Sequence, residues 1–218
     1  MNEIVKAMEI IGTIAFAVSG SIVAIDACLD IFGVVFVGCI TAVGGGIVRD
    51  LLLGINPPSI FNNFSIFLIA MITCILVFII AYINRKRFDL FKEKIEYINN
   101  FFDAIGLAAF TIIGSEVGFI HGFANNYFII IVIGMITGVG GGIFRDVLID
   151  RTPYVFKKYV YAVPTILGSL LYFIMRIYIE NIVLTSMLPM ILIIIIRFLA
   201  TKYRWSLPKI HIDNNVEK

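Results

Sequence analysis

The sequence predicts an all-α membrane protein with seven transmembrane helices, in which a three-helix unit occurs twice with inverted topology and a seventh helix follows. Composition, the number of long apolar segments and an internal repeat support this fold class. Of the 218 residues, 60% are hydrophobic and 15% are charged, and the mean hydropathy is +1.00. A soluble domain needs more polar residues to cover its surface, so the bilayer is the expected solvent.

Seven apolar segments are long enough to span a membrane. A helix needs about 20 mostly apolar residues to cross the hydrocarbon core. The expected spans are residues 7–25, 31–53, 62–83, 101–120, 126–149, 159–179 and 182–200. The first span lacks the basic residues that begin a signal peptide, so we expect it to be retained as a helix. Residues 1–200 then form a single transmembrane domain, and residues 201–218 form a cytoplasmic tail.

Basic residues gather after alternate spans, and this distribution predicts the orientation. Cytoplasmic loops are enriched in Lys and Arg. Clusters follow the third, fifth and seventh spans, and their members are Arg85, Lys86, Arg87, Lys92 and Lys94; Arg151, Lys157 and Lys158; and Lys202, Arg204, Lys209 and Lys218. The other side has Lys6 and Arg176. We therefore expect a multi-pass protein of the plasma membrane with its N-terminus outside and its C-terminus in the cytoplasm.

The internal repeat divides the chain into two halves. Residues 41–57 align with residues 137–153 at an offset of 96, and ten of the seventeen positions are identical. The preceding helices align at an offset of 94, for example Ile11-Gly12 with Ile105-Gly106. Repeat one covers about 7–83 and repeat two about 101–179, while 182–200 stands outside the repeat. Because each unit has three spans, the second copy must enter the membrane from the opposite face.

Each repeat contains three consecutive glycines inside an apolar span. A glycine in a helix interior is less favourable than alanine by about 1 kcal/mol. One explanation is close packing of helix backbones. The other is a bend or local unwinding that frees backbone groups along a path, and paired interruptions of this kind mark binding sites in inverted-repeat transporters. We favour glycine-broken helices two and five, with the hinge at Gly44, Gly45, Gly46, Gly140, Gly141 and Gly142.

Charged pairs follow the two triplets, at Arg49-Asp50 and Arg145-Asp146. Adjacent residues on a helix point about 100° apart, so we expect these charges to pair across elements and not within each dipeptide. Charges at membrane depth usually face a bundle interior or a cavity. The carboxylates would attract cations at two opposite mouths while the arginines brace the bent helices. The structural alternative is that both pairs only anchor helix ends at the headgroups.

Several other polar residues are weaker candidates for the path. Thr41 and Thr137 offer hydroxyls, although threonine in such helices often bonds its own backbone. Ser21 and Ser115 suit helix packing, and Glu116 is a carboxylate deep in the fourth span. Asp103, near a span end, is interpreted as a solvated cap or an interface charge.

Other function classes are not supported by the sequence. It has no HExxH, GxSxG or phosphate-loop motif, so no enzyme activity is expected. Cys28, Cys39 and Cys74 are too few and too widely spaced for a disulfide framework or a metal site. The net charge of +2 predicts no nucleic-acid partner. No cofactor is expected, and the ligands to consider are a permeant potassium ion and a lipid.

The duplicated segments Thr41-Ala-Val-Gly-Gly-Gly-Ile-Val-Arg-Asp50 and Thr137-Gly-Val-Gly-Gly-Gly-Ile-Phe-Arg-Asp146 resemble the prokaryotic branch of the trimeric intracellular cation (TRIC) channel family, which is also described as glycine transporter-like. The resemblance covers roughly residues 7–200. It implies a homotrimer of seven-helix protomers, each with its own pore lined by bent helices, and permeation of monovalent cations, chiefly potassium. Many relatives carry a basic residue in span four where this chain has Glu116-Val117.

Three functions are therefore consistent with the sequence. The first is a potassium-permeable cation channel with a pore in each protomer. The alternative is a secondary transporter of a small neutral amino acid such as glycine, because inverted repeats with broken helices also describe carriers. The third is a structural membrane scaffold in which the glycines serve packing only. Expected partners are the lipid bilayer, further copies of the chain, and monovalent cations or a small solute.

Overall fold

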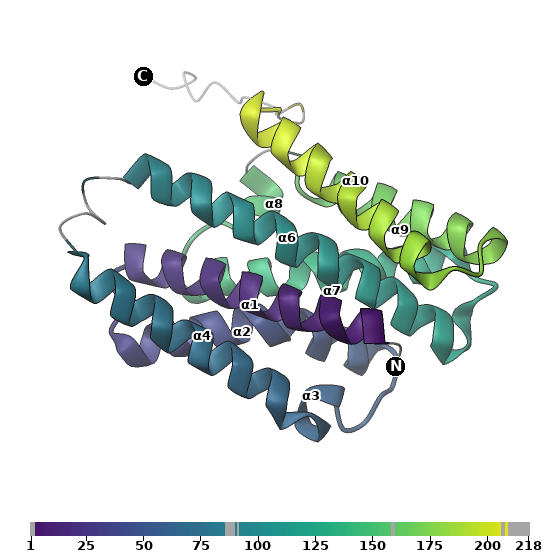
Figure 1. Cartoon of the computed structure of the whole chain (residues 1–218), viewed down its shortest axis with the longest axis horizontal. Helices are drawn as coiled ribbons and strands as arrows, with labels where there is room; N and C mark the ends of the chain where they lie inside the picture. The colour runs from purple at the N-terminus through teal and green to yellow at the C-terminus, as the bar shows by residue number, and fades with distance from the viewer. Residues whose placement is uncertain (1–2, 86–89, 91, 158–159, 206–207, 209–218) are drawn as a thin grey trace, which may run out of the picture.

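The computed structural model describes residues 3–85, 90, 92–157, 160–205 and 208, and the regular structure of this part is helical (Figure 1). The long helices are α1 (Glu3–Asp26), α2 (Ile31–Leu52), α4 (Phe64–Ile83), α6 (Lys92–Gly118), α7 (Tyr127–Leu148), α9 (Ala162–Tyr178) and α10 (Ile182–Lys202). Two short helices, α3 (Ser59–Asn62) and α8 (Tyr154–Lys157), follow α2 and α7, and a π-helical segment (Phe119–Phe123) continues α6.

Six of these helices are long and apolar enough to cross a membrane within the described part of the chain, and α9 is a shorter apolar helix of 17 residues. All seven overlap the predicted spans. Helix α4 is apolar yet mostly uncovered, and Ile79, Ile80 and Ile83 are 44%, 62% and 74% exposed, which suits contact with lipid. Of the predicted tail and basic clusters, residues 86–87, 158, 206–207 and 209–218 lie outside the described residues.

Helix starts in the two repeats use equivalent caps. The Asp30 carboxylate accepts a hydrogen bond from the Gly33 N–H at 2.8 Å, and the Asn126 side-chain oxygen accepts one from the Ile129 N–H at 3.2 Å. A side-chain acceptor at this position satisfies a backbone donor that has no partner inside the helix. Asp30 and Asn126 are 96 residues apart, so α2 and α7 begin at equivalent positions of the repeat.

The two repeats pack against each other in opposite directions. Figure 1 shows α1 and α6 side by side, with α1 starting at the end of the bundle where α6 finishes. Helices α2 and α7 cross at the glycine triplets. A Cβ on Gly45 would overlap the Thr137 carbonyl oxygen, and one on Gly141 would overlap the Thr41 carbonyl oxygen. These reciprocal contacts are those of an antiparallel, pseudo-symmetric crossing.

The glycine triplets do not unwind their helices, so the prediction of glycine-broken helices is wrong on this point. Both α2 and α7 are α-helical through Gly44 to Gly46 and Gly140 to Gly142. The glycines instead remove side chains at the crossing, which lets the two backbones touch while each keeps its own hydrogen bonds. The central glycine is the member of the triplet that meets the backbone of the other helix in both repeats. At the third position, Gly46 has only the Arg49 guanidinium nearby, at 3.8 Å, whereas a Cβ on Gly142 would lie 2.9 Å from the Tyr161 hydroxyl.

We expect Gly45→Ala to destabilise the protein by about 1–3 kcal/mol, because the new methyl group forces the tightly packed helices apart. The measurement is the thermal unfolding midpoint of detergent-solubilised protein. Gly46→Ala is the matched control: its nearest neighbour beyond the helix backbone would be the Arg49 Nη2 atom at 3.8 Å. It should be neutral or stabilise by up to about 1 kcal/mol. Equal effects of the two substitutions would contradict the packing role of Gly45.

Candidate functional site

The Arg-Asp dipeptides pair internally, contrary to the prediction from helix geometry. Arg49 Nε donates to Asp50 Oδ1 at 2.7 Å, and Arg145 Nε donates to Asp146 Oδ1 at 2.8 Å. The expected pairing across elements is confirmed for Arg145, which also pairs with Asp103 of α6 at 2.9 Å, and it is wrong for Arg49. The internal pairs were not predicted because the directions of the Cβ atoms alone were considered. The long arginine stem bends back along its helix over the glycine three residues earlier and returns the guanidinium to the neighbouring carboxylate.

The second oxygen of each aspartate binds the chain that follows. Asp50 Oδ2 accepts from the Ser59 N–H at 2.7 Å, and Asp146 Oδ2 accepts from the Tyr154 N–H at 2.8 Å. Ser59 and Tyr154 are the first residues of α3 and α8, where N–H groups lack helical partners. Both aspartates are buried, so they fasten the connecting segments and do not face water at the mouths of a path.

A larger group of charges surrounds Asp103 in the second repeat; we name Asp103, Arg145, Tyr161 and Arg197 the Asp103 cluster. Asp103 accepts from Arg145 Nη1 at 2.9 Å, from Arg197 Nη2 at 3.3 Å and from the Tyr161 hydroxyl at 3.2 Å. The Arg197 guanidinium also stacks 4.3 Å from the centre of the Tyr161 ring. Asp103 is 0% exposed, so its interpretation as a solvated cap or interface charge is wrong.

Buried charges of this kind must be paired and hydrogen-bonded to be tolerated in a low-dielectric interior. The Asp103 cluster and Asp146 together contain two carboxylates and two guanidinium groups. Three donors of the cluster still have no partner among the described residues, namely Arg145 Nη2 and Arg197 Nε and Nη1. Such donors in native proteins usually meet water or a ligand.

A polar connection leads from the Asp103 cluster to a cavity. Arg145 Nη1 donates to the Ser19 hydroxyl at 2.8 Å, and Ser19 donates to Asn99 Oδ1 at 2.8 Å. Asn99 lines a cavity of about 580 Å³ between the end of α1, the end of α4 and the start of α6. The charged residues of its wall are Asp26, Arg85, Glu93, Glu96 and Arg151.

The cavity opens at the end of the bundle that carries the predicted cytoplasmic clusters. Arg151 Nη2 donates to Asp26 Oδ2 at 2.8 Å on its rim, and both side chains are exposed. Cys28 also lines the cavity and is exposed, whereas Cys39 and Cys74 are buried. Among the described residues, the wall therefore carries one carboxylate more than it carries guanidinium groups, together with one accessible thiol.

The weaker candidates lie at helix contacts. Thr41 and Thr137 each donate to the carbonyl four residues earlier at 2.6 Å and pack against Gly20 and Gly114. Ser115 donates to the Ile130 carbonyl at 3.4 Å, and the Ser21 hydroxyl has no partner among the described residues. These hydroxyls largely form hydrogen bonds within a helix or pack at contacts between helices, at equivalent positions of the two repeats.

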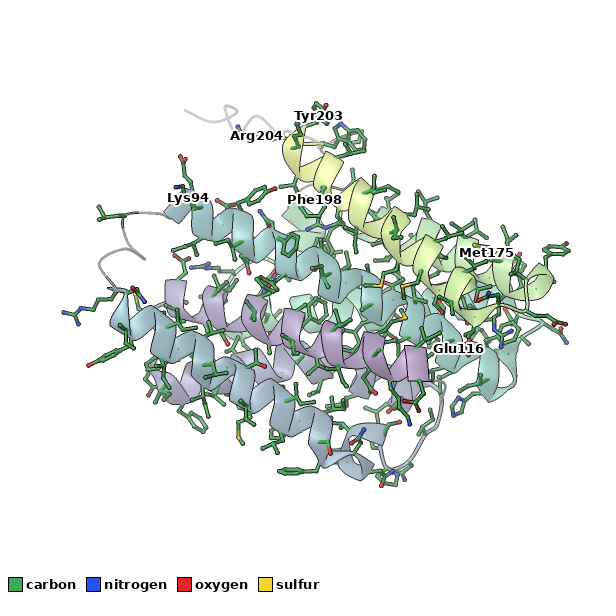
Figure 2. The ribbon with its side chains drawn as sticks, viewed as in Figure 1. Lys94, Glu116, Met175, Phe198, Tyr203 and Arg204 are labelled. Atoms are coloured by element: carbon green, nitrogen blue, oxygen red, sulfur yellow. The ribbon has the colours of Figure 1, made fainter. Side chains whose placement is uncertain are left out.

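Glu116 lies at the end opposite the cavity. Figure 2 shows it where α6 meets α9, far from Lys94 at the start of α6. It is mostly buried, accepts a hydrogen bond from the Tyr172 hydroxyl and lies 3.5 Å from Arg176 Nε. Its charge is therefore offset locally. Within the described residues, no group of three or more His, Cys, Asp or Glu side chains is arranged to hold a metal ion.

The sequence reasoning missed Arg197 and the roles of Asp103, Ser19 and Asn99. The available signal was the position of Arg197 inside an otherwise apolar span and of Asp103 at the start of another, since charges at membrane depth are usually paired. Which residue pairs with which is a matter of three-dimensional contact, because Arg197 and Asp103 are 94 residues apart.

An inverted pair of helical repeats, crossing at glycines and held by buried Arg-Asp groups, defines a multi-pass membrane protein. A family model described as "Glycine transporter" matches residues 6–82 and again residues 100–176, one match for each repeat. The chain belongs to this family.

Its relatives include the UPF0126 membrane protein YvgT of Bacillus subtilis, 40% identical over 75% of this chain and 77% of the relative. The UPF0126 inner membrane protein YadS of Escherichia coli is 33% identical over 95% of this chain and 97% of the relative. The structure described as "Crystal structure of a prokaryotic TRIC channel in 0.5 M KCl" has a TM-score of 0.84 and 34% identity, over 93% of this chain and 98% of that chain. A TRIC orthologue from Rhodobacter sphaeroides has a TM-score of 0.82 and 25% identity, over 93% and 99%.

We expect Arg197→Met to lower the unfolding free energy by about 3–5 kcal/mol, because it removes one partner of a buried ion pair and leaves the Asp103 charge undercompensated. Chemical denaturation in detergent micelles provides the measurement. Arg151→Met is the matched control: it breaks an exposed pair of similar type, and the expected loss is below about 1 kcal/mol. A loss below 1 kcal/mol for Arg197→Met would show that the cluster is not a buried charge network.

Proposed function

We propose that this protein is a monovalent cation channel, chiefly for potassium, in which each protomer of a homotrimer has seven spans and its own path. The path starts at the cavity, passes Asn99 and Ser19 to the Asp103 cluster, and continues between α1, α2, α6 and α7 to the opposite end. The observation that carries the proposal is the 580 Å³ cavity whose inner wall connects to buried polar groups by hydrogen bonds.

Two further lines of support come from electrostatics and from the relatives. Among the described residues of the cavity wall, carboxylates outnumber guanidinium groups, and a net negative wall concentrates cations next to low-dielectric surfaces. Three of the structural relatives are described as TRIC or TRIC cation channels.

The glycine crossing keeps α2 and α7 in contact, so the Asp103 cluster and this crossing together form the constriction of the proposed path. The positive-inside distribution assigns the cavity to the cytoplasmic side.

Planar-bilayer recording of the purified protein in a KCl gradient tests the function. A cation channel should give unitary, ohmic currents that reverse close to the potassium equilibrium potential. Replacing KCl with the chloride of a large organic cation should remove the current. Well-folded trimers that carry no current under any voltage would contradict the proposal.

The thiol of Cys28 allows a test of the cavity as part of the path. A cationic thiol reagent such as methanethiosulfonate ethyltrimethylammonium should lower the potassium current by at least about half when added on the cavity side, because it places a bulky positive charge in the path. Cys39 and Cys74 are buried, so Cys28→Ser should show no response to the reagent, whatever its starting current. Full modification of Cys28, verified by mass spectrometry, without a change in current would exclude the cavity from the path.

A secondary transporter of a small neutral amino acid is the second candidate. The unpartnered guanidinium donors of Arg145 and Arg197 favour it, because such donors suit a carboxylate, and the matching family model is described as a glycine transporter. This function requires saturable uptake of radiolabelled glycine into proteoliposomes and competition by unlabelled glycine. Non-saturating ohmic current without glycine uptake would exclude it.

A further inference from the structure

We propose that Glu9 is the carboxylate that attracts cations to the end of the path opposite the cavity. It holds this role because the first repeat lacks the groups that neutralise its counterpart, Asp103, in the second repeat. The inference rests on the proposed cation permeation and names a selectivity-determining residue for it.

Glu9 and Asp103 are equivalent positions of the repeat. The segment Glu9-Ile10-Ile11-Gly12 aligns with Asp103-Ala104-Ile105-Gly106 at an offset of 94. Each acid lies on the first helix of its repeat, which packs against the helix that carries the Arg-Asp pair. Asp103 contacts Arg145 directly. At the equivalent place of the first repeat, α1 with Glu9 packs against α2, which carries Arg49 and Asp50.

The surroundings of the two acids differ. Asp103 is fully buried and receives hydrogen bonds from Arg145, Arg197 and Tyr161. Glu9 is only partly buried, and within the described residues it has neither a hydrogen bond nor an ion pair. Arg197 belongs to α10, which has no counterpart in the first repeat, and in the part of the chain that the structure describes no guanidinium forms an ion pair with Glu9.

The two ends of the repeat therefore differ in charge. The group formed by Glu9, Arg49 and Asp50 has two carboxylates and one guanidinium, whereas the Asp103 cluster with Asp146 has two of each. Two other acids near this end have partners: Glu116 contacts Arg176 and Tyr172, and Glu3 pairs with Lys6 at 2.8 Å. Glu180, in the connection between α9 and α10, is exposed to solvent. The negative charge of a half-buried carboxylate without a direct partner is not cancelled by a neighbouring positive group. Its electric field therefore raises the local concentration of cations.

The test is Glu9→Gln in planar bilayers, with potassium current driven from the Glu9 side. At 0.1 M KCl we expect the conductance to fall about 1.5- to 2-fold, the factor for one unit charge about 7 Å from the ion in water with a screening length of about 10 Å. The effect should shrink at 1 M KCl, where the screening length is about 3 Å. The preference for potassium over chloride should fall as well. Glu9→Asp keeps the charge and should restore most of the conductance at 0.1 M.

Glu3→Gln is the matched control, since Glu3 lies on the same helix but is exposed and paired with Lys6. It should leave both conductance and selectivity unchanged. If Glu9→Gln conducts like the unsubstituted protein at 0.1 M KCl while Cys28 modification still blocks the current, the role of Glu9 is wrong and the channel remains. If the unsubstituted trimer carries no current, the proposed function fails, and this inference fails with it.

Discussion

The crossing of α2 and α7 is the constraint on which the rest of the structure depends. The two backbones meet at Gly45 and Gly141, each against a threonine carbonyl of the other helix. Lipid tails are as apolar as the helices, so the hydrophobic effect does not drive helices together inside the bilayer. Helix association there relies on close packing and polar contacts. A crossing at one central glycine pair sets the pseudo-two-fold axis and puts one Arg-Asp pair toward each end of the bundle.

The burial of charge then determines which groups surround each Arg-Asp pair. Arg49 and Arg145 each hold the neighbouring aspartate, and the aspartate holds the start of the next short helix. In a low-dielectric interior an unpaired charge is far more unfavourable than a paired one. The two residues of each pair therefore divide the work: the arginine compensates the carboxylate, and the second carboxylate oxygen connects the end of α2 or α7 to the segment that follows.

Helix α10 makes the two ends unequal. An inverted repeat alone would give both ends the same chemistry, but Arg197 adds a second guanidinium beside Asp103 and stacks on Tyr161. The cavity with its polar connection through Ser19 and Asn99 lies at this end. With this asymmetry, an ion or a small solute that entered the proposed path would meet different charges at its two ends.

Much of this architecture was determined by the sequence itself, because apolar segments of about 20 residues have few alternatives to spanning helices. The offset of 96 likewise predicted the repeat and its inversion, since an odd number of spans reverses the second copy. Only the tertiary structure decided three features: the glycines serve helix contact, each arginine pairs with the aspartate beside it, and Arg197 pairs with Asp103. Residue spacing gives the direction of a Cβ atom, but the reach of a long arginine stem and the identity of the facing helix depend on how all the helices pack together.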